Sequence, residues 1–157
     1  MTGIHSGRFE YVIAALALFS ITCFIPVRAA ENASAKELII NRERAALDRW
    51  KTGDTLGFIE ITGDEITYFD PTLETRITGK KEFQNYLASF AGTFSFPRYE
   101  LLNPLVQLHG ETGVLTFNFV GYSKDDKTNK WNATEIYHLV KGEWKLVSSH
   151  WSHTKPD

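Results

Sequence analysis

Cysteine is nearly absent from this sequence of 157 residues, which contains one Cys and one Met. A single cysteine excludes a disulfide framework, and it excludes zinc and iron–sulfur sites built from several cysteines. An excess of basic residues is also absent, because 17 Lys and Arg stand against 19 Asp and Glu. A nucleic-acid-binding surface must neutralise phosphates, so the net charge of −2 argues against DNA or RNA as a partner.

The composition is that of one ordinary domain. The length excludes two domains of full size. Hydrophobic residues make up 43% of the chain and charged residues 23%, which is typical of a globular protein and excludes a disordered one. Aromatic residues reach 13%, with four tryptophans among them. This aromatic content predicts a well-packed core or a cavity with aromatic walls.

The N-terminal segment 1–29 differs from the rest of the chain. Tyr11–Val27 contains no charged residue. Val27 and Ala29 fit the −3 and −1 positions of a signal-peptidase site, which predicts cleavage after Ala29. We therefore expect a signal peptide over residues 1–29.

The mature domain would then be 30–157, periplasmic or secreted, with no membrane attachment after cleavage. Two alternatives stay open. The apolar run is at the short limit for a bilayer span, so it could be an uncleaved anchor. Cys23 could also carry a lipid, although Thr22 before it is not the small residue that lipidation prefers.

The first half of the mature chain predicts helices. Ser34 and Glu37 form a capping box, and an apolar stripe with helical spacing follows as far as Trp50. Gly53 is expected to end this helix, because glycine adopts the left-handed conformation at low cost. Asp54 is expected to cap a short second helix. A third helix should begin near residue 79 and end by residue 92.

The second half predicts strands, because the hydrophobic period changes to two. A short strand before Pro71 precedes this region. The four longer strands are expected at 99–108, 114–122, 131–140 and 144–153. Short turns between them require antiparallel pairing. Helices followed by a meander predict an α+β domain whose helices cover one face of the sheet.

Four segments carry a resemblance to known proteins. They are IINRERAALDRWKTGD at 39–54, ITYFDP at 66–71, LLNPLVQLHGE at 101–111 and GEWKLVSSHWSH at 142–153. Their order and spacing resemble the SnoaL-like group of the nuclear-transport-factor-like (cystatin-like) superfamily. The pattern is most similar to the association domain of calcium/calmodulin-dependent protein kinase II and its secreted bacterial relatives.

This resemblance implies a cone-shaped cystatin-like fold, with N-terminal helices packed on a strongly bent antiparallel sheet. It also implies a homodimer or higher oligomer that pairs through the outer face of the sheet. Because the fold hosts both enzymes and binding modules, the resemblance alone leaves the activity open. It implies no cofactor.

Two carboxyl groups are the catalytic candidates. By resemblance to ketosteroid isomerases, Asp70 occupies the position of the general base, which can transfer a proton if desolvation raises its pKa. Glu135 lies near the position of a second carboxyl that, when protonated, donates a hydrogen bond to an enolate. The family's oxyanion tyrosine would fall at Ala46, which has no hydroxyl. The alternatives are a turn-forming role for Asp70 and a solvent-facing Glu135.

Three positions bear on the charge of a ligand. By resemblance, Asn118, Glu135 and Trp151 fall where association-domain relatives carry pocket arginines. Three arginines would hold a carboxylate by charge-assisted hydrogen bonds. An asparagine, a glutamate and a tryptophan would not, so an anionic ligand is not expected here.

Tyr137 and Trp151 are expected to line the cone, and Tyr68 belongs to the same group of aromatic residues. His150 is interpreted as a polar residue of the cavity or of an interface. It is separated from His153 by three positions, which places the two side chains on opposite faces of a strand. This spacing does not form a metal clamp, and no metal site is predicted.

Two functions remain as alternatives. In the first, the cone binds a small, largely apolar molecule, with acid–base chemistry of the isomerase or cyclase type as an open extension. In the second, the domain is a non-catalytic assembly module. A contiguous apolar outer face would favour assembly, whereas a deep cone with buried carboxyls would favour a ligand.

Overall fold

The computed structural model describes residues 24–125 and 127–154. Within these ranges the elements are α1 (Phe24–Trp50), α2 (Leu56–Ile61), β1 (Thr62–Phe69), β2 (Ile77–Thr78), α3 (Lys80–Ala88), β3 (Arg98–His109), β4 (Thr112–Tyr122), β5 (Thr128–Val140) and β6 (Glu143–His153). This order confirms the predicted α+β class.

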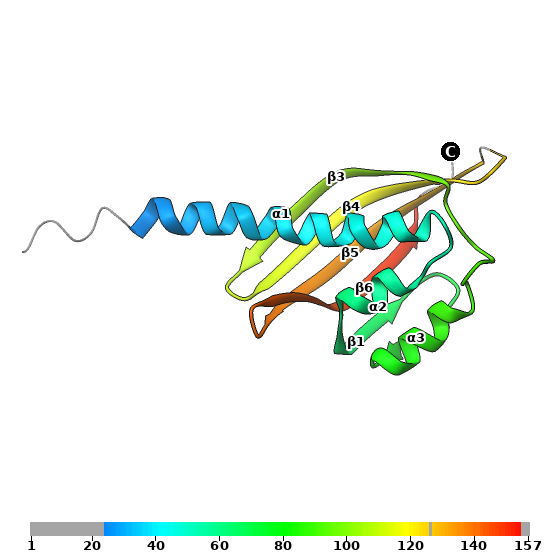
Figure 1. Cartoon of the computed structure of the whole chain (residues 1–157), viewed down its shortest axis with the longest axis horizontal. Coiled ribbons are helices and arrows are strands. Elements are labelled where there is room, and N and C mark those ends of the chain that lie inside the picture. Colours follow the sequence, from blue (N-terminus) through cyan, green and yellow to red (C-terminus); the bar gives the residue numbers. More distant parts are fainter. Residues whose placement is uncertain (1–23, 126, 155–157) are drawn as a thin grey trace, which may run out of the picture.

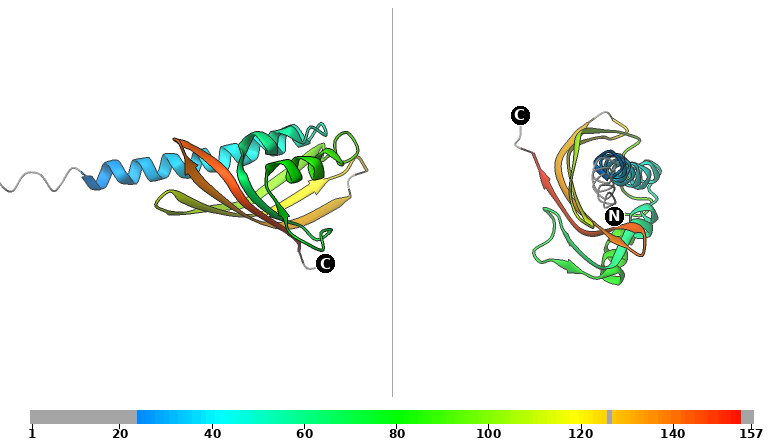
Figure 2. Two further views of the ribbon diagram at one scale, coloured as in Figure 1. Left: turned by 90° about the horizontal axis from the view of Figure 1, so that it is seen from below. Right: turned by 90° about the vertical axis from the view of Figure 1, so that its left-hand side faces the viewer.

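The strands form one sheet in the order β2-β1-β6-β5-β4-β3. Strands β3 to β6 make the predicted antiparallel meander. Strand β1 pairs in parallel with β6. This pairing was not predicted, because no short turn links the two strands. The sheet bends around α1, as the view along the helix in Figure 2 shows.

Helix α1 lies along the concave face of the sheet (Figure 1). Ile39, Ala46 and Leu47 of the predicted stripe are buried there. Gly113 on β4 lets the helix approach closely, since a Cβ at this position would lie 2.6 Å from Cδ1 of Ile39. The Ile39 side chain, on the apolar stripe of the helix, therefore occupies the space that Gly113 leaves on the sheet surface.

The start of α1 differs from the prediction. The helix already includes Phe24, so Ser34 lies inside it and is exposed rather than forming its N-terminal cap. Residues 28–38 are rich in Ala, Glu and Lys, which favour helix without a cap at Ser34.

The expected signal peptide falls mostly on residues 1–23, which lie outside the described residues. Ala29, the predicted cleavage position, lies within α1. Among the helices of the described part, none has the length and apolar character needed to cross a membrane.

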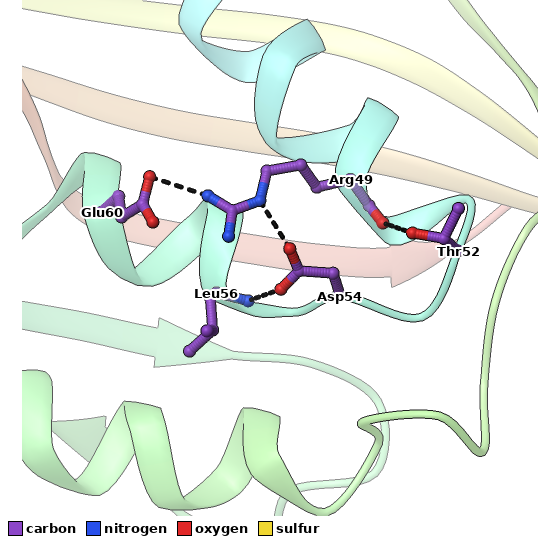
Figure 3. Close-up of polar contacts among 5 residues, drawn as sticks. All are labelled: Arg49, Thr52, Asp54, Leu56 and Glu60. Carbon is purple, nitrogen blue, oxygen red and sulfur yellow. Dashed lines mark hydrogen bonds and ion pairs between the residues drawn. The ribbon is translucent and has the colours of Figure 1, made fainter.

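Polar contacts fix the corner between α1 and α2 (Figure 3). Gly53 has a φ of 81°, as expected for the end of the helix. Asp54 Oδ1 accepts a hydrogen bond from the Leu56 amide at 2.9 Å. Arg49 donates to Asp54 Oδ2 at 2.7 Å and pairs with Glu60 at 2.7 Å. The guanidinium thus ties the end of α1 to both ends of α2.

The two faces of the sheet have different compositions. Leu115, Phe117 and Phe119 of β4 point to the inner face and are buried. Between them in sequence, Asn118 points outward and is exposed. A β-bulge shifts the β5–β6 register between Ile136 and Tyr137, so the inward-facing series on β6 changes phase there.

Candidate functional site

A cavity of about 340 Å³ lies between the helices and the inner face of the sheet. Eleven of its eighteen lining residues are Phe, Tyr or Trp. They come from distant parts of the chain, including Trp50 at the end of α1, Phe58 on α2, Phe83 on α3, Phe90 after α3 and Trp151 on β6. Trp50 and Phe58 belong to the two helices that meet at the corner in Figure 3. Their rings contact each other edge to face, with centroids 5.4 Å apart, and form one part of the cavity wall.

One carboxylate lies in the cavity wall, directly after β1. Asp70 Oδ2 accepts hydrogen bonds from the hydroxyls of Tyr68, at 3.1 Å, and of Tyr86. Its Oδ1 accepts from the amide and hydroxyl of Thr72, at 2.8 and 2.7 Å. We call these four residues the rim cluster. Each carboxylate oxygen of Asp70 therefore has two donors, which is its full acceptor capacity.

The rim cluster controls the charge of Asp70. Desolvation raises the pKa of this carboxyl, but the hydrogen bonds from Tyr86, Thr72 and Tyr68 outweigh it, so the pKa falls below its usual value. The condition stated for proton transfer, a pKa of Asp70 raised by desolvation, is therefore not met. Burial and the bond to Asp70 raise the pKa of Tyr86 to about 12, which keeps this tyrosine a donor.

Glu135 lies behind the cavity wall on β5 and is fully buried. Its Oε1 accepts hydrogen bonds from Ser149 Oγ at 2.9 Å and from Trp151 Nε1 at 3.0 Å. Ser149 and Trp151 themselves line the cavity. The solvent-facing alternative for Glu135 is thereby wrong, and the carboxyl acts on the cavity through these two side chains.

A second buried carboxyl, Glu43, projects from α1 toward the same region of the sheet. Its Oε2 accepts a hydrogen bond from the Tyr137 hydroxyl at 2.7 Å. Both Glu43 and Tyr137 are fully buried. We call Glu43 and Glu135 the buried acid pair.

Burial favours the protonated form of both acids. It raises the pKa of Glu43 to about 7, against the hydrogen bond from Tyr137. Burial and then the charge of Glu43 raise the pKa of Glu135 well above its usual value. Glu43 Oε1 and Glu135 Oε2 have no hydrogen-bond partner. A proton retained by the pair reduces the cost of leaving these oxygens buried.

The structure separates the predicted site residues into three groups. Asp70, Tyr68 and Trp151 line the cavity. Glu135 and Tyr137 are on the same inner face but are buried behind the wall and beneath α1. Asn118 and His150 are exposed on the outer face, where Asn118 bonds to Asn132 and His150 lies 6.0 Å from the Phe69 ring.

Strand alternation explains why Asn118 and His150 were misplaced. Asn118 neighbours Phe117 and Phe119, which face inward, so its own side chain must face outward. On β6, the inward positions after the bulge are Ser149 and Trp151, which leaves His150 between them on the other face. Neither residue can line the cone.

Glu43 was missed, although its position carried a signal. It lies four residues after Ile39 and four before Leu47, on the apolar stripe of α1. An acid on the buried stripe of a helix needs a partner in the core. That partner, Tyr137, was recognised, but only as a cavity residue.

The cavity lining contains few ionisable side chains. Among its lining residues in the described part of the chain there is no Lys or Arg. Asp70 supplies the negative charge, and His153 and Asn129 stand at the exposed end of the wall. In residues 24–125 and 127–154, no group of three or more His, Cys, Asp or Glu could hold a metal ion.

Comparison with known families gives one match. Residues 43–156 match the SnoaL-like domain. None of the curated proteins matches the chain.

Many solved structures share the fold, including the following three. A Parabacteroides distasonis protein, provisionally named a ketosteroid isomerase, is 35% identical over 75% of this chain and 86% of its own, with a TM-score of 0.68. An NTF2-like protein of unknown function from Pseudomonas putida is 21% identical over 79% and 89%, with a TM-score of 0.71. The CaMKII hub of S. rosetta is 20% identical over 75% and 95%, with a TM-score of 0.60. The predicted cystatin-like fold is confirmed.

Proposed function

This chain belongs to the SnoaL-like domain family, and we propose that it binds a small, largely apolar molecule in the aromatic cavity. The observation that carries this proposal is the wall itself: eleven aromatic residues surround about 340 Å³ of space. Ligand cavities of this kind combine a mostly apolar lining with a few fixed polar groups. Here the rim cluster, Ser149 and Trp151 supply the polar groups.

The proposal is tested with a neutral apolar fluorophore, N-phenylnaphthylamine. Asn129 is exposed and lines the cavity, so Asn129→Trp should narrow the entrance without disturbing the core. We expect at least about tenfold weaker binding, equivalent to about 1.4 kcal/mol. Asn132→Trp is the matched control, because Asn132 is an exposed residue on the outer face of the same strand. Equal binding by both variants would contradict the proposal.

Isomerisation is a second candidate function. It is favoured by the 35% identity to the Parabacteroides protein named a ketosteroid isomerase and by an ionised Asp70 in the cavity wall. Asp70 would take a proton from carbon next to a carbonyl group, with one of its four hydrogen-bond donors displaced to free an oxygen, and return the proton elsewhere on the ligand. The assay uses a β,γ-unsaturated ketosteroid and follows the conjugated product by absorbance. Activity that survives Asp70→Asn would exclude this role.

The non-catalytic assembly module is less well supported than ligand binding. Exposed polar residues interrupt the outer face of the sheet, including Asn118, Asn132, Thr134 and His150. A contiguous apolar face is therefore not present on these strands. We still propose a homodimer or higher oligomer as the working assembly, supported by the likeness of fold to the S. rosetta hub.

Native mass spectrometry of the protein from its own host tests assembly and ligand together. A dimer with a reproducible additional mass is the expected result. A folded monomer would contradict the assembly proposal and leave the ligand proposal unaffected.

We also propose export to the periplasm or the cell exterior, directed by residues 1–29. N-terminal sequencing of the secreted protein should begin at Ala30. An intact Met1, or a lipid on Cys23, would contradict this proposal.

A further inference from the structure

We propose that the ligand of this cavity is a small organic cation, whose alkylated ammonium group sits against the aromatic wall next to Asp70. This inference rests on the proposed ligand-binding function and narrows it to one chemical class. Three features of the site carry it: the aromatic faces, the sign of the charge, and the saturation of the Asp70 oxygens.

The aromatic rings near Asp70 form a continuous surface. The Tyr68 and Tyr86 rings are 5.6 Å apart between centroids, and the Tyr86 and Phe90 rings are 5.0 Å apart. Trp131 and Trp151 line the same cavity from the sheet side. The faces of such rings carry negative electrostatic potential and attract cations that lie within about 6 Å of the centroid.

The charges around the cavity have one sign. Asp70 is held in its ionised form by four hydrogen bonds, and none of the described lining residues is Lys or Arg. Glu135 and Glu43 lie buried behind the wall, where burial favours their protonated, neutral forms, so Asp70 is the carboxylate that gives the lining its charge. An anionic ligand would enter this site without a partner and lose its hydration, which is costly.

The Asp70 oxygens favour an alkylated cation over a hydrogen-bonding ligand. Both oxygens already accept two hydrogen bonds each, from Tyr68, Tyr86 and Thr72. A hydroxyl or a primary ammonium group would have to displace one of these donors. A quaternary ammonium group has no polar hydrogen, so it can gain the charge attraction while the rim cluster stays intact.

The test compares two molecules of nearly equal shape, phenyltrimethylammonium and tert-butylbenzene, which differ by one positive charge. Benzoate serves as the anionic probe. Three of the four tryptophans, Trp50, Trp131 and Trp151, line the cavity, so their fluorescence reports binding. We expect phenyltrimethylammonium to bind about tenfold more tightly than tert-butylbenzene, and benzoate not to bind.

Three variants assign the discrimination to the site. Asp70→Asn removes the charge with little change in side-chain volume, and it should abolish most of the preference for the cation over tert-butylbenzene. Asp64→Asn is the matched control, because Asp64 is an exposed carboxylate on β1 outside the cavity. It should leave the preference unchanged. His153→Gln separates any contribution of that imidazole, and we expect the preference to persist.

The outcomes are distinct. Tighter cation binding that depends on Asp70 supports the inference. Equal or tighter binding of tert-butylbenzene would overturn it while the proposed ligand-binding function stands. Failure of all three probes and of N-phenylnaphthylamine to bind would overturn both.

Discussion

Asp70 and Glu135 are carboxyl groups in and behind the wall of the same cavity, yet their surroundings favour opposite charge states. Asp70 is half-buried and receives four hydrogen bonds, which lower its pKa below the usual value despite desolvation. Glu135 is fully buried, receives two, and has one oxygen with no partner, so burial raises its pKa. The depth of burial and the number of donors on each oxygen together decide whether a carboxyl in this wall stays charged.

The same contrast separates the rim cluster from the buried acid pair as a whole. The rim cluster is made of adjacent elements, β1, the turn after it and α3, and its donors are hydroxyls and one amide. The acid pair joins α1 to the sheet and has an oxygen left over on each member. The rim therefore holds a fixed charge, while the pair holds protons that can be lost as pH rises.

The largest expected effect is the pH dependence of stability caused by Glu43. Its folded-state pKa is about 7, above the ordinary value of 4.5, so the folded chain binds more protons than the unfolded chain in this interval. The free energy of unfolding should therefore fall as pH rises from 4.5 to 7. Each pKa unit corresponds to about 1.4 kcal/mol, which gives a loss on the order of 3 kcal/mol.

Glu43→Gln isolates this contribution, because it removes the titrating proton and keeps the side-chain shape. Urea unfolding measured across the same pH interval should show a smaller loss of stability in this variant. Glu37→Gln, at an exposed position of α1, is the matched control and should behave like the unaltered protein. Parallel curves for all three proteins would show that Glu43 is not a proton-retaining group.

The second-largest expected effect is the loss of stability on removing the Tyr137 hydroxyl, which donates a hydrogen bond to Glu43. Tyr137→Phe removes the hydroxyl 2.7 Å from Glu43 Oε2 and leaves a buried carboxyl without any partner. We expect a loss of about 2 kcal/mol in the free energy of unfolding.

Tyr122→Phe is a closely matched control for Tyr137→Phe. The Tyr122 hydroxyl also donates to a glutamate, Glu100, at 2.7 Å, but this pair is exposed. The control should lose less than about 0.5 kcal/mol. Equal losses would mean that burial does not distinguish the two bonds.

The fold was predictable because its local signals agree with its tertiary structure. The stripe on α1, the glycine at its end and the alternation of β4 and β5 each matched the observed element. The parallel pairing of β1 with β6 depended on contacts between distant segments and was not accessible from local patterns.

The site was predictable only in part. Asp70 was identified as a cavity residue from its place before Pro71 and from family resemblance. Three of the four hydrogen bonds that Asp70 accepts come from Tyr68 and Thr72, which are two residues away in sequence. The fourth comes from Tyr86, sixteen residues away on α3, and no sequence pattern indicates that contact. Asn118 was assigned to the cone through resemblance, and His150 was interpreted as a residue of the cavity or of an interface. The alternation of their own strands places both outside the cone.

Replacing each acid by its amide sharpens the comparison between the two carboxyls. At neutral pH Asp70→Asn removes the charge that strengthens four hydrogen bonds, and we expect a loss of about 1 kcal/mol. Glu135→Gln resembles the protonated acid and retains an acceptor for Ser149 and Trp151, so it should cost less stability than Asp70→Asn.

The pH profile provides an independent check on Asp70. Because its folded-state pKa is lowered, its contribution is present above the ordinary value of 3.8 and is lost as pH falls below it. Unfolding measured at acid pH should thus bring the unaltered protein and Asp70→Asn together. A constant difference between them would mean that the charge of Asp70 plays no part.

The smallest expected effect lies outside the cavity, at the corner between α1 and α2. Arg49 bonds to Asp54 and pairs with Glu60, and its hydrogen bond, assisted by its charge, lowers the pKa of Asp54. This carboxylate has a formal cation as its partner, whereas Asp70 has only hydroxyls and an amide. Exposed ion pairs gain little because water and salt screen them, so Arg49→Gln should lower the melting temperature only slightly. A larger decrease in melting temperature for Arg49→Gln than for Asp70→Asn would show that the corner, rather than the rim cluster, holds the cavity wall in place. In that case, high salt should reduce the difference in melting temperature between Arg49→Gln and the unaltered protein.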